Sequence, residues 1–171
     1  MGETSFQPAE IIAALERHGV RYVVIGGLAA TLHGSPLMTT AADICPARDE
    51  DNLQRLARAL VELRARIRAA GVPEGLAFAC NAAFLSRIEV ALNLTTRFGD
   101  LDLSFVPSGT SGFEDLRQQA VTMSLMGRPV AVASLADVIR SKEAANRAKD
   151  QTALPALRLL LQQLKTRGGD R

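Results

Sequence analysis

Hydrophobic residues recur at helical spacing in several stretches of the chain. Because positions three and four apart share one face of a helix, each stretch predicts an amphipathic helix packed against a core. Pro8 opens the first helix and Gly19 ends it, and Ser134 and Asp137 have the spacing of a capping box that opens a later one. The predicted helices cover residues 8–18, 28–33, 53–67, 113–119, 138–149 and 155–164.

Runs of β-branched and alternating apolar residues predict strands between these helices. They cover residues 22–25, 41–45, 90–95, 101–105 and 130–132, and the third and fourth form a hairpin around the turn at 97–100. The stretch 77–88 fits a helix or a strand equally well. The order of elements predicts an α/β (α+β) fold, a mixed β-sheet flanked by helices.

Size and composition indicate one globular domain. The chain has 171 residues, of which 47% are hydrophobic, enough for a full core without disulfides. We expect a single domain over residues 1–165 and a flexible tail over 166–171, which contains Gly168 and Gly169. No apolar run approaches the roughly 18 residues that span a bilayer, and the N-terminus lacks a signal peptide pattern. These features predict a cytoplasmic protein with no membrane partner.

Charge and metal-binding residue types exclude several other functions. A net charge of +2 is too small to indicate a nucleic-acid binder by itself. His18 and His33 have no cysteine or acidic partners at the spacing of a zinc site. Cys45 and Cys80 lie in apolar stretches and are typical of buried thiols in a reducing compartment.

The most informative segment joins a glycine pair to an acidic strand. Gly26 and Gly27 follow a predicted strand, where they either form a tight turn or let the backbone approach a phosphate. Asp43 lies in an apolar strand, and a carboxylate there is costly unless a cation or hydrogen bonds compensate it. Strand side chains alternate, so positions 41 and 43 share a side; position 41 is alanine.

A second cluster of charges lies on the helix predicted after Ser134. Lys142 and Lys149 are seven residues apart, hence nearly eclipsed on a helix, and Asp150 is about 80° from Lys142 around the axis. Arg147 adds another cation to this segment. The cluster is either a solvated charged face or a phosphate-binding face.

These segments resemble the DNA polymerase β-like nucleotidyltransferases in their minimal bacterial form. The resemblance places the family's glycines at Gly26 and Gly27 and its Asp-x-Asp at Ala41-Ala42-Asp43. The third acid falls on Asp102, with Asp100 as its rival. The segments 28–36 and 134–150 are similar to the toxin branch, represented by the MenT toxins of MenAT toxin–antitoxin pairs and by AbiEii toxins.

The resemblance implies a site for two Mg²⁺ ions and a nucleoside triphosphate, CTP or another pyrimidine nucleotide. Its metal ligands would be Asp43 and Asp102 with an acid at position 41, and Asp150 would complete the site or orient Lys142. The implied reaction moves a nucleoside monophosphate onto the 3′ end of tRNA and blocks aminoacylation, and the implied partner is an antitoxin. The implied phosphate contacts are Gly26, Gly27, Thr40, Lys142, Arg147 and Lys149.

The departure at Ala41 should inactivate such an enzyme, because the missing acid bridges the metals. Either the chain is a degenerate relative, or aspartate was replaced by alanine deliberately to make a toxin tolerable to its host. We favour the second explanation because every other position of the pattern is kept. Two alternatives stay open: transfer to a small molecule or a protein hydroxyl, and a non-catalytic nucleotide-binding relative.

Overall fold

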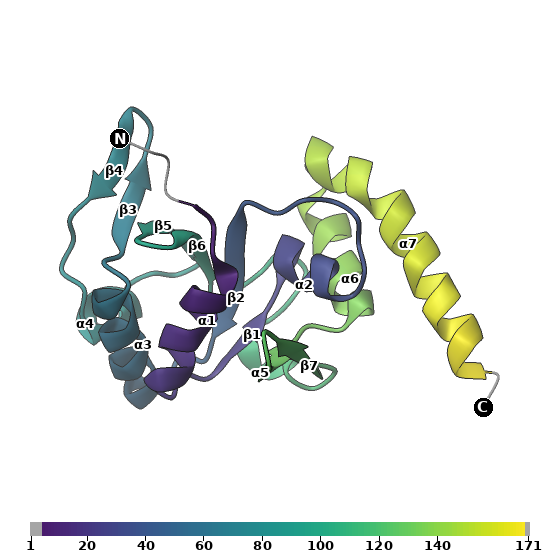
Figure 1. Ribbon diagram of the computed structural model, residues 1–171, viewed down its shortest axis with the longest axis horizontal. Helices are drawn as coiled ribbons and strands as arrows, with labels where there is room; N and C mark the ends of the chain where they lie inside the picture. Colours follow the sequence, from purple (N-terminus) through teal and green to yellow (C-terminus); the bar gives the residue numbers. More distant parts are fainter. Residues whose placement is uncertain (1–4, 170–171) are drawn as a thin grey trace.

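A single mixed β-sheet with helices packed on it forms the protein (Figure 1). The computed structural model describes residues 5–169. The eight strands in this range lie in the order β4-β3-β5-β6-β2-β1-β8-β7. β2 pairs in parallel with β6, and β1 with β8, whereas the other neighbours are antiparallel. The α/β class with a mixed, helix-flanked sheet is confirmed.

The strands follow the alternating and β-branched runs of the sequence. They are β1 (Tyr22–Val24), β2 (Ala41–Pro46), β3 (Arg66–Ala69), β4 (Val72–Leu76), β5 (Ala91–Thr96), β6 (Gly99–Ser104), β7 (Val121–Leu125) and β8 (Arg128–Val132). The helices are α1 (Pro8–Arg17), α2 (Gly26–Leu32), α3 (Glu50–Glu62), α4 (Ala82–Ser86), α5 (Phe113–Leu116), α6 (Leu135–Ala145) and α7 (Ala148–Gly169).

The sequence did not predict three of the strands, β3, β4 and β7. The helix expected to run to Ile67 ends at Glu62, because Arg64 adopts a left-handed conformation at φ 55° and turns the chain into β3. β4 contains Pro73, which is tolerated because β4 is an edge strand whose backbone N–H groups need no partner. β7 is the other edge; its residues alternate between apolar and polar, but the strand is short and most of its side chains are exposed.

The final helix also differs from the prediction. Pro155 was expected to open it, but α7 begins at Ala148 and carries Pro155 in its interior. The helix continues through Thr166 to Gly169, into the segment expected to be a flexible tail; residues 170 and 171 lie outside the described residues. None of the helices within 5–169 is both long and apolar enough to cross a bilayer.

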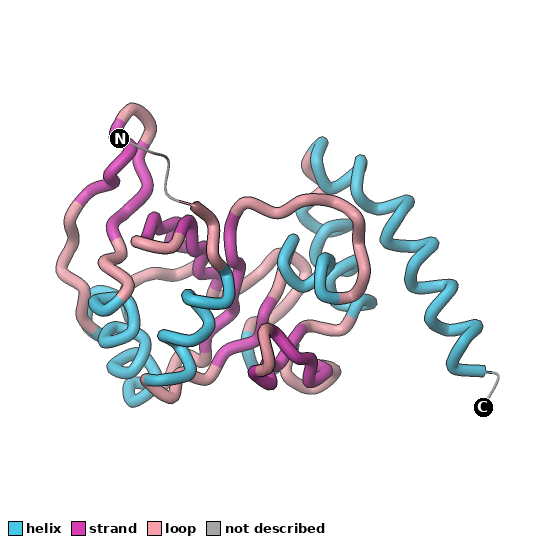
Figure 2. The backbone as a smooth tube through the Cα atoms, viewed as in Figure 1, coloured by secondary structure: helices cyan, strands magenta, loops and turns pink. Residues whose placement is uncertain are grey.

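The helices form two groups on the sheet. α1, α3 and α4 pack together beside β2, and α2, α6 and α7 form the second group. Figure 2 shows the loop of residues 33–40 that leaves α2 and arches over to the start of β2. α2 lies against β2, with Gly26 close to Asp43.

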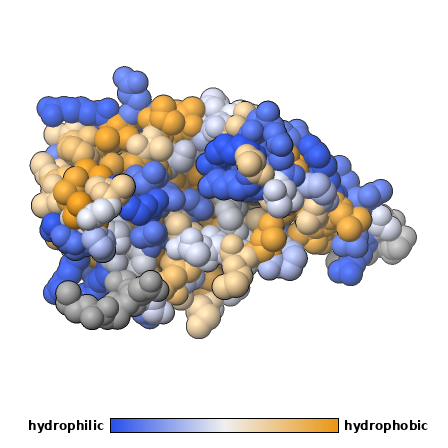
Figure 3. Space-filling model, turned by 90° about the horizontal axis from the view of Figure 1, so that it is seen from above, coloured by the Kyte–Doolittle hydropathy of each residue, from blue (hydrophilic) through white to orange (hydrophobic). Residues whose placement is uncertain are grey.

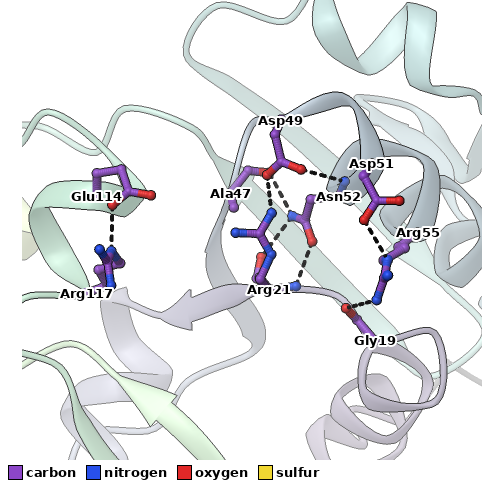
Figure 4. A network of polar contacts seen from close by, with 9 residues as sticks. All are labelled: Gly19, Arg21, Ala47, Asp49, Asp51, Asn52, Arg55, Glu114 and Arg117. Carbon is purple, nitrogen blue, oxygen red and sulfur yellow. Dashed lines mark hydrogen bonds and ion pairs between the residues drawn. The ribbon is translucent and has the colours of Figure 1, made fainter.

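A buried asparagine fixes the opposite end of β1 and β2 (Figure 4). The Oδ1 atom of Asn52 accepts a hydrogen bond from the backbone N–H of Arg21 at 2.7 Å, and its Nδ2 donates to the carbonyls of Arg21 at 2.9 Å and Ala47 at 2.7 Å. Asp49 caps α3 by accepting from the Asn52 N–H and also pairs with Arg21. This network ties α3 to both strands and so holds their register.

Candidate functional site

Strand alternation places Asp43 and Asp102 on the same face of the sheet. Asp43 lies directly opposite Asp102 in the parallel pairing of β2 with β6. Their neighbours Ile44 and Leu103 are fully buried on the other face, which packs into the core. The alternation therefore leaves one face of these two strands apolar and the other acidic, and brings the two expected metal ligands together.

Asp102 opposes the ionisation of Asp43. Burial, together with the charge and hydrogen bonding of Asp102, raises the pKa of Asp43 to about 7. The backbone N–H of Gly27 and the charge of Lys149 act in the opposite direction but do not compensate. A carboxyl pair held in this way gains most from a ligand that carries positive charge.

The glycine pair begins α2 at the edge of the acidic face. Gly26 has φ +60°, a left-handed conformation, and a Cβ atom there would lie 2.7 Å from Oδ2 of Asp43. A Cβ on Gly27 would lie 3.0 Å from Oγ1 of Thr39. The glycines thus serve the tight turn, one of the two roles expected from the sequence, and also allow the close approach of Asp43.

Position 41 lies beside these acids. Ala41 is the first residue of β2, lies opposite Asp100 on β6 and lines the same cleft as Asp43. Its carbonyl accepts a hydrogen bond from Oγ1 of Thr39 at 2.9 Å. Thr40, one of the expected phosphate contacts, also lines the cleft. An aspartate at position 41 would therefore project from the strand onto the acidic face.

The residues of the lysine cluster come from two helices, α6 and α7, whereas the sequence predicted that they lie on a single helix. α6 ends at Ala145, and Asn146 adopts a left-handed conformation at φ 51°, so Lys149 and Asp150 belong to α7. The argument from seven-residue spacing on a single helix was therefore wrong. The turn nevertheless brings Nζ of Lys142 within 3.6 Å of Oδ1 of Asp150.

Asp150 contacts both Lys142 and Arg147 in this cluster. Its side chain is fully buried and accepts from Nε of Arg147 at 2.7 Å and from the backbone N–H of Arg147 at 3.1 Å. Burial alone would raise the pKa of Asp150, but the bonds from Arg147 and the charge of Lys142 outweigh it and hold the pKa below its usual range. Asp150 thus fixes two cations while lying beneath the surface.

One cleft contains both clusters. It has a volume of about 830 Å³ and is lined by every expected site residue except the buried Asp150: Gly26, Gly27, Thr40, Ala41, Asp43, Asp102, Lys142, Arg147 and Lys149. Figure 3 views the molecule from the side that is uppermost in Figure 1; a hydrophilic cluster lies on the half toward α7, and hydrophobic residues are mixed with hydrophilic ones over both halves. One cleft thus contains both the acids and the cations.

Sequence reasoning missed one charged side chain of the site. Arg68 of β3 lines the cleft, with Nη2 at 2.6 Å from Oδ1 of Asp102 and Nη1 at 3.2 Å from Oδ2 of Asp100. Its strand had been predicted as the end of a helix, where Arg68 would be an ordinary surface residue. Only the pairing of β3 with β5, which in turn pairs with β6, brings Arg68 to the acids.

Comparison with solved structures identifies the architecture. The lincosamide antibiotic adenylyltransferase LnuA, solved with lincomycin bound, aligns over 90% of this chain and 95% of its own, with a TM-score of 0.59 and 15% identity. The antibiotic-modifying ANT(2'')-Ia, in complex with adenylyl-2''-tobramycin, aligns over 94% and 95% with a TM-score of 0.55 and 13% identity. The chain has the nucleotidyltransferase fold.

A third similar structure with this fold is TM1012 of Thermotoga maritima, whose own assignment as a nucleotidyltransferase is provisional. It aligns over 91% of both chains with a TM-score of 0.55 and 17% identity. Comparison with protein-family models and with curated proteins gives no match. The structural similarity therefore shows the nucleotidyltransferase fold, but the sequence identities are too low to indicate the substrate of this protein.

The cleft residues fit a divalent cation only in part. Among residues 5–169, no three His, Cys, Asp or Glu side chains are grouped so as to hold a metal ion. Asp43 and Asp102 are adjacent and present the hard oxygen ligands that Mg²⁺ prefers. The donor set therefore fits a cation held by two carboxylates. It lacks the third acid of a two-metal site, because position 41 is alanine.

Proposed function

We propose that this protein is a nucleotidyltransferase that moves a nucleoside monophosphate from a nucleoside triphosphate to a hydroxyl group. One observation carries the proposal: the Asp43–Asp102 pair and the Lys142–Arg147–Asp150 cluster line or underlie one cleft. Transfer of a nucleotide needs cations for the triphosphate and carboxylates for a divalent metal.

Each cluster has its own task in the reaction. Lys142, Arg147 and Lys149 bind the triphosphate and orient its α-phosphorus toward the acids. Asp150 positions Lys142 and Arg147, and the Gly26–Gly27 turn keeps the backbone close to Asp43. Asp43 and Asp102 would hold Mg²⁺, which would neutralise the charge that develops as pyrophosphate leaves and would favour loss of the proton of the attacking hydroxyl.

The acceptor that we propose is the 3′ end of tRNA, with CTP or another pyrimidine nucleotide as the donor. In that role the protein would be the toxin of a toxin–antitoxin pair, acting in the cytoplasm and held in check by a cognate antitoxin. The mouth of the cleft supports an RNA end, because exposed Leu37, Met38 and Val90 lie at the same cleft as the cations. Apolar side chains beside cations suit unstacked bases and their phosphates.

Alanine at position 41 should weaken the reaction strongly. Its methyl group replaces a carboxylate on the acidic face, and two-metal transfer loses a bridging ligand. We therefore expect the chain as it stands to bind nucleotide but to transfer it poorly. An Ala41→Asp variant should gain transfer that depends on Mg²⁺ and is lost in the presence of EDTA.

The test incubates the Ala41→Asp variant, beside the chain with Ala41, with total tRNA, Mg²⁺ and each labelled nucleoside triphosphate in turn. Label on tRNA only with the Ala41→Asp variant, and from one or two triphosphates, supports the proposal and names the donor. The matched control is Ala41→Asp combined with Asp43→Asn, which has the new carboxylate without its neighbour. Label with this control contradicts the proposed role of Asp43, and no label with any protein contradicts tRNA as the acceptor.

A second acceptor class is a small-molecule hydroxyl. It is favoured by the similarity to LnuA and ANT(2'')-Ia, whose structures contain lincomycin and adenylyl-2''-tobramycin. The same incubation with lincomycin or tobramycin in place of tRNA distinguishes the two classes. Label on the antibiotic and none on tRNA would assign the small-molecule reaction, and nucleotide binding without any transfer by Ala41→Asp would indicate a non-catalytic relative.

A further inference from the structure

Arg68 connects the acidic face of the sheet to a strand far from it in sequence. Its guanidinium has three acceptors: Oδ1 of Asp102 at 2.6 Å, Oδ2 of Asp100 at 3.2 Å and the carbonyl of Leu94 at 3.0 Å. The side chain is 35% exposed and lines the cleft. A partly exposed cation is therefore held on a carboxylate that the proposed function assigns to Mg²⁺.

The contact between Arg68 and Asp102 favours the protein without a divalent cation. Asp43 and Asp102 repel each other across adjacent strands, and Arg68 offsets part of that repulsion. When a divalent cation lies on the same two carboxylates it takes over this role, and the positive guanidinium then repels it. A contact that stabilises the free state more than the bound state weakens binding.

We propose that Arg68 competes with the divalent cation for Asp102 and makes productive cation binding depend on the nucleotide. This inference rests on the proposed function, because it assigns the competing partner to the same cleft. A triphosphate carries the negative charge that can draw the guanidinium away from Asp102, since Arg68 lines the cleft together with Lys142 and Lys149. Arg68 is thus a positioning residue that acts on a metal ligand.

The neighbouring arginine of the same strand supplies a matched control. Arg66 also lies in β3, two residues away and so on the same side of the strand, but its Nε donates to the carbonyl of Gly75 and none of its contacts reaches an acid of the cleft. Replacing either arginine by glutamine removes one positive charge from β3. Only Arg68→Gln removes that charge from Asp102.

The experiment titrates Mn²⁺ into the full chain without nucleotide and measures free Mn²⁺ by electron paramagnetic resonance. Arg68→Gln should bind Mn²⁺ about tenfold more tightly than the native chain, the effect expected of one charge removed near a partly exposed site. Arg66→Gln and Arg68→Lys should stay within about twofold of the native affinity. Arg68→Gln combined with Asp102→Asn should lose the gain.

Two results would overturn the inference. Equal or weaker Mn²⁺ binding by Arg68→Gln would make Arg68 a support for Asp102 and not its competitor. Failure of both the native chain and Arg68→Gln to bind Mn²⁺ would remove the cation site itself. Neither result depends on transfer to tRNA, so a failed transfer assay with the expected Mn²⁺ affinities would contradict only the proposed function. Far-ultraviolet circular dichroism of each variant checks that it is folded.

Discussion

Replacing Asp43 by asparagine should stabilise the protein at alkaline pH and remove a carboxylate that the cleft needs. The pKa of Asp43 in the folded protein is raised from 3.8 to about 7, mainly because its carboxyl group is buried and also because it faces Asp102. The folded protein therefore binds this proton more tightly than the unfolded chain does. The free energy of unfolding must fall as the pH rises from about 4 to about 7.

The magnitude follows from the same shift. One pKa unit corresponds to about 1.4 kcal/mol, so a rise from 3.8 to about 7 would make ionised Asp43 cost the folded protein about 4 kcal/mol at pH 8. Because its side chain keeps some contact with solvent, we expect about 2 kcal/mol in practice. Asparagine keeps the shape of the side chain and carries no charge, so the variant should recover this amount.

The assay is urea unfolding of the native chain and Asp43→Asn at pH 4.5 and pH 8, with EDTA present at both. The variant should be about 1 kcal/mol more stable than the native chain at pH 4.5, where the unfolded chain has already lost most of this proton, and about 2 kcal/mol more stable at pH 8. Asp51→Asn is the control, because Asp51 is 68% exposed and pairs only with Arg55; it should change stability by less than about 0.5 kcal/mol. A variant less stable than the native chain at pH 8, or a difference independent of pH, would refute the reasoning.

Two further substitutions test the turn and the far end of the strands. Gly26→Ala should lower the free energy of unfolding by about 1–2 kcal/mol, because its backbone is left-handed. It should also weaken Mn²⁺ binding, because the new Cβ would lie 2.7 Å from Oδ2 of Asp43. The control Gly71→Ala, at φ +77° with no atom within 4 Å of the new Cβ, should show only the backbone effect in urea unfolding. Asn52→Ala should cost about 3 kcal/mol, since it leaves the backbone N–H of Arg21 and the carbonyl of Ala47 without their partner. Urea unfolding measures the loss, and an unchanged midpoint would contradict the role of this network.

The sequence predicted the elements whose local pattern agrees with their place in the fold. β2 and β6 were found because apolar residues such as Ile44 and Leu103 alternate with polar ones, and α1 because Pro8 and a regular apolar stripe mark it. The strands that were missed, β3, β4 and β7, lie at or near the edges of the sheet, where exposed side chains and a proline are tolerated. β4 contains a proline and a glycine, and the alternation in β3 and β7 covers few residues.

In the candidate site, too, the sequence predicted only the residues that are locally unusual. Asp43 and the glycines could be singled out because a carboxylate in an apolar strand and a glycine pair at its neighbour are locally unusual. Arg68 could not, because a surface arginine is common and only the order of strands brings it to Asp102. Residues that act through tertiary pairing carry no local signature.

The Lys142–Asp150 pair shows that a correct pairing can follow from a wrong argument. Helical geometry placed the two residues on one face of a continuous helix, whereas Asn146 breaks that helix and α7 folds back on α6. The pair forms because fully buried Asp150 needs cations, and the turn supplies Arg147 from its own segment and Lys142 from the preceding helix. The energetic requirement of the buried carboxylate, more than the spacing along the chain, therefore determines which residues meet at this end of the cleft.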